Sequence, residues 1–286
     1  MTRPTAAPWR RILLTALFAV LPLGADGTVS LSYETLDFAN SRQKNEGERF
    51  GITTRFHHQD HTFLLGAERT DTETKQPPLT EDLQVDKWFA AYAFRLTDDL
   101  TLRASYLHIE DNIAPTDDGY ITGVGLRYRL GEHVNLAADG YHSRYRIMDV
   151  YQGDLSVRFG AEFGALHTDL TLIGKYIEPR GCTTGWCRNA EPDYFTPGFK
   201  FHAGYRGYHG GFGAFFGRRV FGVMAEGTKV QHHAMEFDRT WMVGAGKKFG
   251  PLDAVLKFTY LRAEELPLNQ RNVKVRNTAL TLSYHY

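Results

Sequence analysis

The sequence predicts an all-β protein, a transmembrane antiparallel up-and-down β-barrel of about 14 strands, within a range of about 12 to 16. Three observations predict this fold. From residue 28 to the C-terminus, polar and apolar residues alternate with a period of two, the pattern of strands with one polar and one apolar face. The connections between these segments alternate between short and long. Aromatic residues lie toward the ends of the apolar faces, and the opposite faces carry charges.

The first 25 residues are expected to be a secretory signal peptide. Three arginines lie in this segment around the start of an apolar run over residues 12–23, and small residues follow the run. The run falls short of the ~20 apolar residues that a membrane-spanning helix needs. We therefore expect cleavage near Ala25 and a barrel over residues 26–286.

The composition excludes several other classes of protein. The chain has 286 residues, with 33 Lys and Arg against 33 Asp and Glu, and two cysteines. A zero net charge gives no reason to expect nucleic acid as a partner. Two cysteines cannot build a disulfide framework, and a mean hydropathy of −0.37 is too low for a bundle of membrane helices.

Fourteen segments carry the alternation and are expected as strands. Tight connections lie between longer polar ones, the combination of short periplasmic turns and long extracellular loops found in outer-membrane barrels. The expected strands are residues 28–37, 48–57, 61–70, 84–96, 99–109, 119–130, 133–143, 149–160, 165–177, 194–206, 210–221, 235–248, 252–262 and 273–286. The longer connections lie near residues 38–47, 71–83, 110–118, 178–193, 222–234 and 263–272, with a shorter one near 144–148.

A water-soluble β-sandwich is the alternative interpretation of the alternation. Its buried faces hold aliphatic side chains, whereas segments here place aromatics toward their ends, as Trp88, Tyr92 and Phe94 do. The opposite face carries charge in one segment after another, which a closed apolar core does not tolerate. Both features favour the barrel.

The last segment shows the alternation most clearly. Leu280, Leu282, Tyr284 and Tyr286 share one face, and the chain ends on an aromatic residue. With the export signal and the alternating loop lengths, this segment resembles bacterial outer-membrane β-barrel proteins, whose C-terminal strand is recognised by the barrel-assembly machinery. The resemblance covers everything after residue 25 and implies an integral place in outer-membrane lipid with both termini in the periplasm. It says little about activity, because the family includes porins, transporters, enzymes and adhesins.

Strand parity assigns a charged face to the lumen, so we expect the lumen to be hydrated. If the first strand rises from the periplasm, the even-numbered strands carry inward basic residues in their lower halves. These residues would form a basic collar near the periplasmic mouth: Arg55, Arg95, Arg127, Arg129, Arg158, Arg206 and Lys248. The inward acids are Glu34, Glu68, Asp139, Asp154, Asp169 and Asp253. Hairpin pairing places Asp169 near Arg158 and Asp253 near Lys248, whereas Arg55, Arg95 and Arg127 have no obvious acidic opposite.

Two interpretations of the basic collar stay open. Rings of Arg and Lys bias pores toward anions, which would make the collar a selective constriction. The other interpretation is a solvated, salt-bridged wall that only stiffens the barrel.

No metal or cofactor site is expected. Cys182 and Cys187 lie in the longest loop, where an oxidising compartment would join them in a disulfide that braces the loop. Two thiols are too few for a metal site. The histidines and Asp60 in the first tight turn, residues 57–61, are interpreted as a polar hairpin turn.

A membrane-embedded hydrolase is the enzymatic alternative. Outer-membrane phospholipases and lipid A deacylases use a His and a Ser separated by one residue, so that both face the same way. Here Ser143 follows His142 directly, which places the two on opposite faces. We therefore assign no catalytic residues and expect that the chain is not an enzyme.

The leading functional hypothesis is an outer-membrane pore or conduit for small polar solutes, with anions favoured by the collar. The runner-up is a non-conducting barrel that docks a periplasmic or surface protein of a polysaccharide-export, envelope-assembly or electron-transfer complex. A conduit needs loops that fold away from the lumen or only narrow it. A docking protein would present loops 178–193 and 222–234 as its surface.

Overall fold

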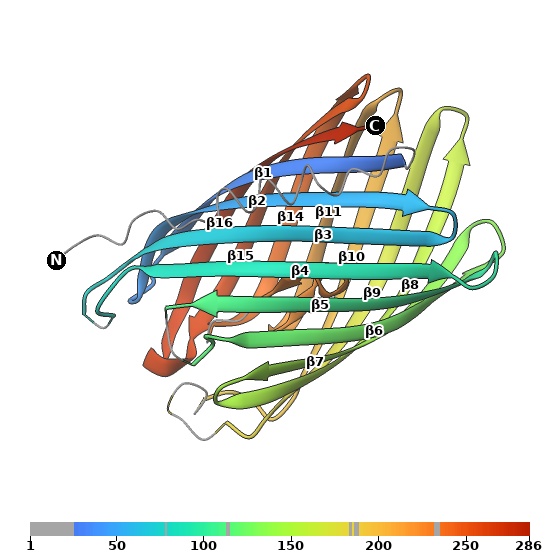
Figure 1. The fold of residues 1–286 in the computed structure, drawn as a ribbon. Coiled ribbons are helices and arrows are strands. Elements are labelled where there is room, and N and C mark those ends of the chain that lie inside the picture. The colour runs from blue at the N-terminus through green and yellow to red at the C-terminus, as the bar shows by residue number, and fades with distance from the viewer. Residues whose placement is uncertain (1–25, 78, 113–114, 183–184, 186–188, 232–234) are drawn as a thin grey trace.

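The computed structural model describes residues 26–286 except 78, 113–114, 183–184, 186–188 and 232–234. Fourteen antiparallel strands close into one barrel (Figure 1), which confirms the predicted fold class and strand number. The barrel strands are β1 (Asp26–Ala39), β2 (Lys44–His58), β3 (His61–Thr74), β4 (Leu83–Arg95), β5 (Leu100–Asp111), β6 (Gly119–Leu130), β7 (Val134–Tyr145), β8 (Met148–Phe163), β9 (Leu166–Arg180), β10 (Tyr194–Tyr205), β11 (Tyr208–Arg219), β14 (Met235–Phe249), β15 (Leu252–Glu265) and β16 (Gln270–His285). Among the described residues, no helix is long and apolar enough to cross a membrane.

The first and last strands close the barrel. β1 pairs with β16 over its whole length, and the backbones of Gly27 and Tyr286 exchange hydrogen bonds of 3.0 and 3.1 Å. Both ends of the barrel chain therefore lie at the end where the short turns lie. The signal peptide expected over residues 1–25 lies outside the described residues and stays a prediction.

Most strands extend further toward the long-loop end than the alternation predicted. β2 begins at Lys44 rather than residue 48, and β3 ends at Thr74 rather than residue 70. At this end the outward face becomes polar and forms ion pairs across strands, such as Arg69 with Asp86 at 3.3 Å. The apolar face that marks a strand in the sequence is missing there, although the backbone ladder continues.

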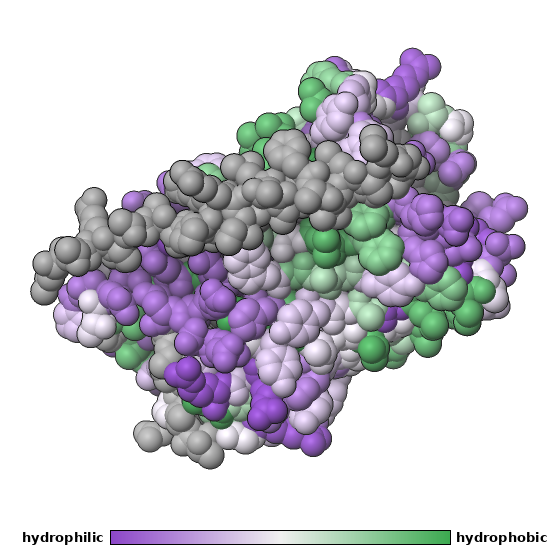
Figure 2. Space-filling view, viewed as in Figure 1, coloured by the Kyte–Doolittle hydropathy of each residue, from purple (hydrophilic) through white to green (hydrophobic). Residues whose placement is uncertain are grey.

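The outward face carries a band of large apolar side chains. Val124 and Leu155 are each 69% exposed, and Leu280, Leu282 and Tyr284 of β16 also point outward and are exposed. Figure 2 shows hydrophobic residues across the middle of the visible face, between hydrophilic residues at its two ends. Such a band, exposed on a closed barrel, is suited to lipid rather than to water.

The long-loop half of the barrel interior is filled with apolar side chains. The connection between β11 and β14 folds inward and contains the short strands β12 (Val223–Met224) and β13 (Lys229–Val230), joined by the 3-10 turn η2 (Ala225–Gly227). We call residues 220–231 the inward loop. Its apolar residues pack with inward residues of the strands, in a core of Leu83, Val85, Leu107, Ile109, Ile121, Ile177, Val220, Phe221, Val223 and Val230.

The inward loop corrects the expectation that residues 222–234 form an external surface. Val220 and Phe221 are fully buried, and the ring of Phe221 lies 5.5 Å from that of Tyr145 on the barrel wall. The physical reason is that the inward positions near the loop end are apolar and need a cover. Residues 232–234 of the expected surface lie outside the described residues.

Candidate functional site

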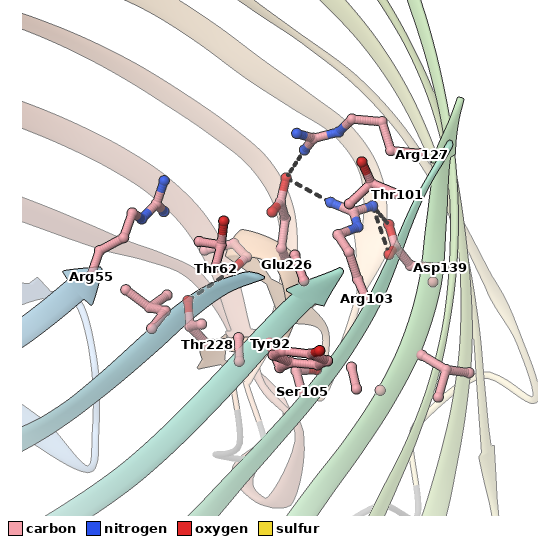
Figure 3. A pocket seen from close by; sticks show the side chains of 18 of the residues that line it. Arg55, Thr62, Tyr92, Thr101, Arg103, Ser105, Arg127, Asp139, Glu226 and Thr228 are labelled. Atoms are coloured by element: carbon pink, nitrogen blue, oxygen red, sulfur yellow. Dashed lines mark hydrogen bonds and ion pairs between the residues drawn. The ribbon is translucent and has the colours of Figure 1, made fainter. Parts of the chain in front are cut away.

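A cavity of about 750 Å³ lies between the inward loop and the short-turn end of the barrel. We call it the basic cavity, because its wall has more basic residues than carboxylates. The basic residues that line it are Arg55, Arg95, Arg103, Arg127, Arg158 and Lys200, and the acidic ones are Asp60, Asp139 and Glu226. Figure 3 shows side chains from neighbouring strands and from the inward loop around this space.

Four members of the predicted basic collar line the basic cavity: Arg55, Arg95, Arg127 and Arg158. Arg158 lies 3.1 Å from Asp169, as the hairpin pairing predicted, and Arg95 lies 3.8 Å from Asp60 in the first turn. Arg129 lies closer to the mouth and pairs with Asp99 at 3.0 Å. Among the described residues, Arg55 has no carboxylate within ion-pair distance.

Two predicted collar members differ from the expectation. Arg206 lies in the turn between β10 and β11 with φ of 49°, followed by Gly207 with φ of 82°, so it leaves the strand alternation and covers the ring of Tyr205 instead. Lys248 is in register with Asp253, but the carboxylate of Asp253 contacts Nε2 of His209 at 2.9 Å.

All six predicted inward acids face the barrel interior, and each has a basic or histidine partner. Glu34 lies 2.9 Å from Arg49, and Glu68 lies 3.3 Å from Arg49 and 3.2 Å from Lys87. The remaining pairs are Asp139 with Arg103, Asp154 with Lys175, Asp169 with Arg158 and Asp253 with His209.

The expectation that water reaches most of these charges is wrong for the middle of the barrel. Side chains in the cluster of Glu34, Arg49, Glu68 and Lys87 are only 6–22% exposed. Direct ion pairing, rather than hydration, stabilises them there. Open space in the interior lies instead in the basic cavity and in a neighbouring cavity of about 340 Å³.

Glu226, at the tip of the inward loop, is a residue of the site that the sequence analysis missed, because strand alternation assigns only residues on strands. Its carboxylate lies 2.9 Å from Arg103 and 2.9 Å from Arg127, as Figure 3 shows. Partial burial raises the pKa of this carboxyl, but the charges of Arg103 and Arg127 outweigh that effect, so its pKa lies below the ordinary value. Glu226 therefore supplies the acidic opposite that Arg127 lacked in the sequence.

Arg103 is positioned by the barrel wall. Its Nη2 donates to both carboxylate oxygens of Asp139 at 2.8 Å, and its side chain is only 12% exposed. Gly125 makes room for this pair, because a Cβ at that position would lie 1.9 Å from an oxygen of Asp139. Gly125 thus has a specific structural role in placing Asp139 beside Arg103.

The inward loop is anchored to the wall by a glutamine amide. Nε2 of Gln152 donates to the carbonyl of Val223 at 2.8 Å, and its Oε1 accepts from the Val223 amide at 2.7 Å. Lys175 donates to the same carbonyl at 3.1 Å. The Gln152 amide thus bonds to Val223 as a neighbouring strand backbone would, with one donor and one acceptor. Together these contacts fix the loop on the β8–β9 side of the barrel.

A glycine of the loop contacts β5, three strands away from β8 along the barrel wall. Gly227 has φ of 92°, and a Cβ there would lie 2.1 Å from Oγ of Ser105. Ala225 and Glu226, just before it, have φ of 50° and 58°. Three successive residues in the left-handed region form a tip that few sequences adopt unless surrounding contacts hold it.

A buried arginine lies where the inward loop leaves the wall. Arg219 is 0% exposed, donates to Thr240 and to Gln231 at 3.0 Å, and lies over the ring of Phe237. Among the described residues, no carboxylate is within ion-pair distance of it. It is therefore a positive charge held by amide, hydroxyl and aromatic groups.

The remaining sequence candidates stay outside the site. Cys182 packs against the apolar core, but Cys187 lies outside the described residues, so the disulfide stays a prediction. The described residues contain no group of His, Cys, Asp and Glu that could hold a metal. Ser143 is buried on the inner face, while His142 lies on the outer face and contacts Asp149 at 2.9 Å, so these neighbours do not form a catalytic pair.

No protein-family model and no curated protein matches the chain. Solved structures share its fold. A bacterial polysaccharide outer membrane secretin has a TM-score of 0.58 at 8% identity, over 93% of this chain and 100% of that chain. The CymD monoaromatic hydrocarbon channel has 0.52 at 9% identity, over 92% and 88%. The Ralstonia pickettii toluene transporter TbuX has 0.51 at 11% identity, over 92% and 90%.

At these identities the similarity is one of fold. The chain has the fold of an outer-membrane β-barrel protein with fourteen strands, as the resemblance of its terminal segment predicted.

Proposed function

We propose that this protein is an outer-membrane conduit for small polar, preferentially anionic solutes, gated by the inward loop. The observation that carries the proposal is the basic cavity, with six basic residues against three carboxylates in its wall. A surplus of Arg and Lys around a water-filled constriction attracts anions and repels cations. Among the structures that share the fold, two are described as a transporter and a channel, which agrees with a conduit.

The proposed orientation has the short turns and both termini in the periplasm. The outward apolar band then lies in outer-membrane lipid, and the polar ends of the strands reach the cell surface. Leu280, Leu282, Tyr284 and Tyr286 in the last strand would be the signal read by the barrel-assembly machinery. The basic cavity opens toward the periplasm in this orientation.

Conduction through the barrel requires movement of the inward loop. Its apolar residues fill the long-loop half of the interior together with Leu107 and Ile109, which are fully buried. Passage of a solute therefore depends on a second position of residues 220–231, in which the core opens.

The same closure favours a second candidate function, a non-conducting barrel that docks a periplasmic or surface protein. The apolar core, sealed over the long-loop half, is the observation in its favour. The export of polysaccharide is one setting, since a structure of the same fold is described as a polysaccharide secretin. A membrane-embedded hydrolase is the least supported candidate, because His142 and Ser143 face opposite sides.

Single-channel recording of the refolded protein in planar bilayers tests the proposal, with a salt gradient to measure ion preference. We expect discrete openings and a reversal potential that favours anions. The triple variant Arg55→Gln, Arg95→Gln and Arg127→Gln should lose most of that preference, whereas Arg129→Gln, next to Asp99 at the mouth, should change it less. A folded barrel that never conducts would contradict the conduit and favour the docking function.

A further inference from the structure

The tip of the inward loop places a carboxylate where a cavity for anions would bind its ligand. Glu226 contacts the guanidinium groups of Arg103 and Arg127, each at 2.9 Å. Both arginines come from neighbouring strands of the wall, β5 and β6, whereas Glu226 comes from a loop between distant strands. In Figure 3 the two arginines converge on the carboxylate from the wall side, while Arg55 lies across the cavity.

Of the two arginines, Arg103 has a partner on the wall that is independent of Glu226. Arg103 is fixed by two contacts of 2.8 Å with Asp139, which sits in the space left by Gly125. Arg127 extends from the adjacent strand into the same cavity. If the carboxylate of Glu226 left, Arg103 would stay fixed on the wall and would leave a guanidinium nitrogen free, next to Arg127, for an oxyanion.

The contact of Glu226 is the exchangeable one. Its side chain is 60% exposed, compared with 13% for Asp139 on the other side of Arg103. Exposed ion pairs are weak because water and dissolved ions compete for both partners. The loop tip also holds Ala225 and Glu226 in left-handed backbone conformations, which favours its release once its contacts are lost.

We propose that Glu226 is an intramolecular competitor for an anion site formed by Arg103 and Arg127, and that a small solute bearing a carboxylate or phosphate displaces it and frees the tip of the inward loop. This inference rests on the proposed function, since it assigns the solute class and the trigger of the same conduit.

The chemistry of the two arginines defines the ligand. Guanidinium groups donate pairs of parallel hydrogen bonds that match the oxygens of a carboxylate or a phosphate, and a halide offers no such geometry. Arg55 and Lys200 also line the cavity and could contact a second anionic group on the same solute. A small dicarboxylate therefore fits better than a monovalent anion.

Isothermal titration calorimetry of the full chain in detergent tests the competition without any need for current. The ligands are succinate and inorganic phosphate, with the neutral analogue succinamide as control. Glu226→Gln keeps the size of the side chain but removes the competing charge, so it should bind succinate about fivefold to tenfold more tightly than the natural protein. Arg127→Gln should bind more weakly, and Glu162→Gln, which removes a charge outside the cavity wall, should match the natural protein.

The direction of the change decides between competition and structural support. If Glu226 instead holds the arginines in place, Glu226→Gln would weaken succinate binding, and that result, or unchanged binding, would overturn the proposal. Equal binding of succinamide would overturn it as well. Tighter binding together with faster trypsin cleavage after Lys229 in saturating succinate would support both displacement and release. Because binding is measured apart from conductance, a protein that binds as expected but conducts nothing would contradict only the proposed function.

Discussion

Replacing Gln152 by alanine should open the proposed gate more often. The Gln152 side chain is 4% exposed and forms two hydrogen bonds with the backbone of Val223, of 2.7 and 2.8 Å. The variant removes both hydrogen bonds. The docked loop then has no side chain from residue 152 to hold it, and it can move away from the wall. In the docked position the Val223 amide would lack a hydrogen-bond acceptor, whereas in the open position it can donate to water, so the variant favours the open position.

The size of the effect follows from the number of bonds. A hydrogen bond contributes about 0.5 to 1.5 kcal/mol net, so the two together stabilise the docked loop by about 1 to 3 kcal/mol. Since 1.4 kcal/mol is a factor of about ten, the ratio of open to closed time should rise roughly fivefold to 150-fold. Gln152→Glu, which keeps an acceptor but loses the donor and faces Asp154 at the same site, should also raise it.

Single-channel recordings of open probability measure this ratio directly. Gln84→Ala is the matched control, because Gln84 lies exposed on the outer face of β4, and it should behave as the natural protein. Heat-modifiable migration on gels checks that each barrel has folded. An unchanged or lower open probability for a folded Gln152→Ala protein would refute the idea that this amide clamps the gate.

Three further predictions follow from the same structure. Phe221→Ala should weaken docking of the inward loop by about 3 kcal/mol, since the ring is fully buried. Trypsin should then cut after Lys229 faster. As a control, Phe216→Ala, which changes a side chain on the outward face, should leave the cleavage rate unchanged. Glu226 has a lowered pKa, so its stabilising contact is complete above the ordinary carboxyl pKa and is lost only as pH falls through the lowered value. The open probability should therefore stay constant from pH 8 to about 5 and rise below about 4. Glu226→Gln should abolish this rise. Arg219→Met should leave the unfolding temperature unchanged or raise it, because a buried charge without a carboxylate gains little over an apolar side chain of similar size; a marked drop would show that its bonds to Gln231 and Thr240 are essential.

The strands could be predicted because period-two alternation and turn residues are local signals. β6 runs from Gly119 to Leu130, as the alternation over 119–130 predicted, since its outward face is apolar through the membrane band. Near the long loops, most strands were predicted too short. The outward residues there, such as Arg69 and Asp71, are polar and break the alternation. The alternation therefore marks only the part of each strand whose outward face is apolar, and the hydrogen-bonded strand is longer than that part.

The inward-folded loop could not be predicted from the loop sequence, but the wall contained a signal for it. Inward positions of β5 change from Arg103 and Ser105 to Leu107 and Ile109 toward the long-loop end. Apolar side chains in the lumen of a barrel this wide require a cover, and the inward loop supplies it here. Glu226 was missed for the same reason, since parity assigns residues on strands and says nothing about a loop that enters the lumen.

The two sides of the inward loop are held by different forces, and this difference gives the proposed gate a direction. On the long-loop side, Phe221 and Val220 are buried in an apolar core, which an approaching polar solute cannot weaken by exchange of contacts. On the short-turn side, the loop meets the basic cavity through the ion pairs of Glu226, whose own side chain is 60% exposed and which, in the proposal above, a dissolved anion replaces. A solute from the short-turn end therefore meets the weaker contact first. In the proposed orientation that end faces the periplasm, so the proposed gate would open first to a solute that arrives from the periplasmic side.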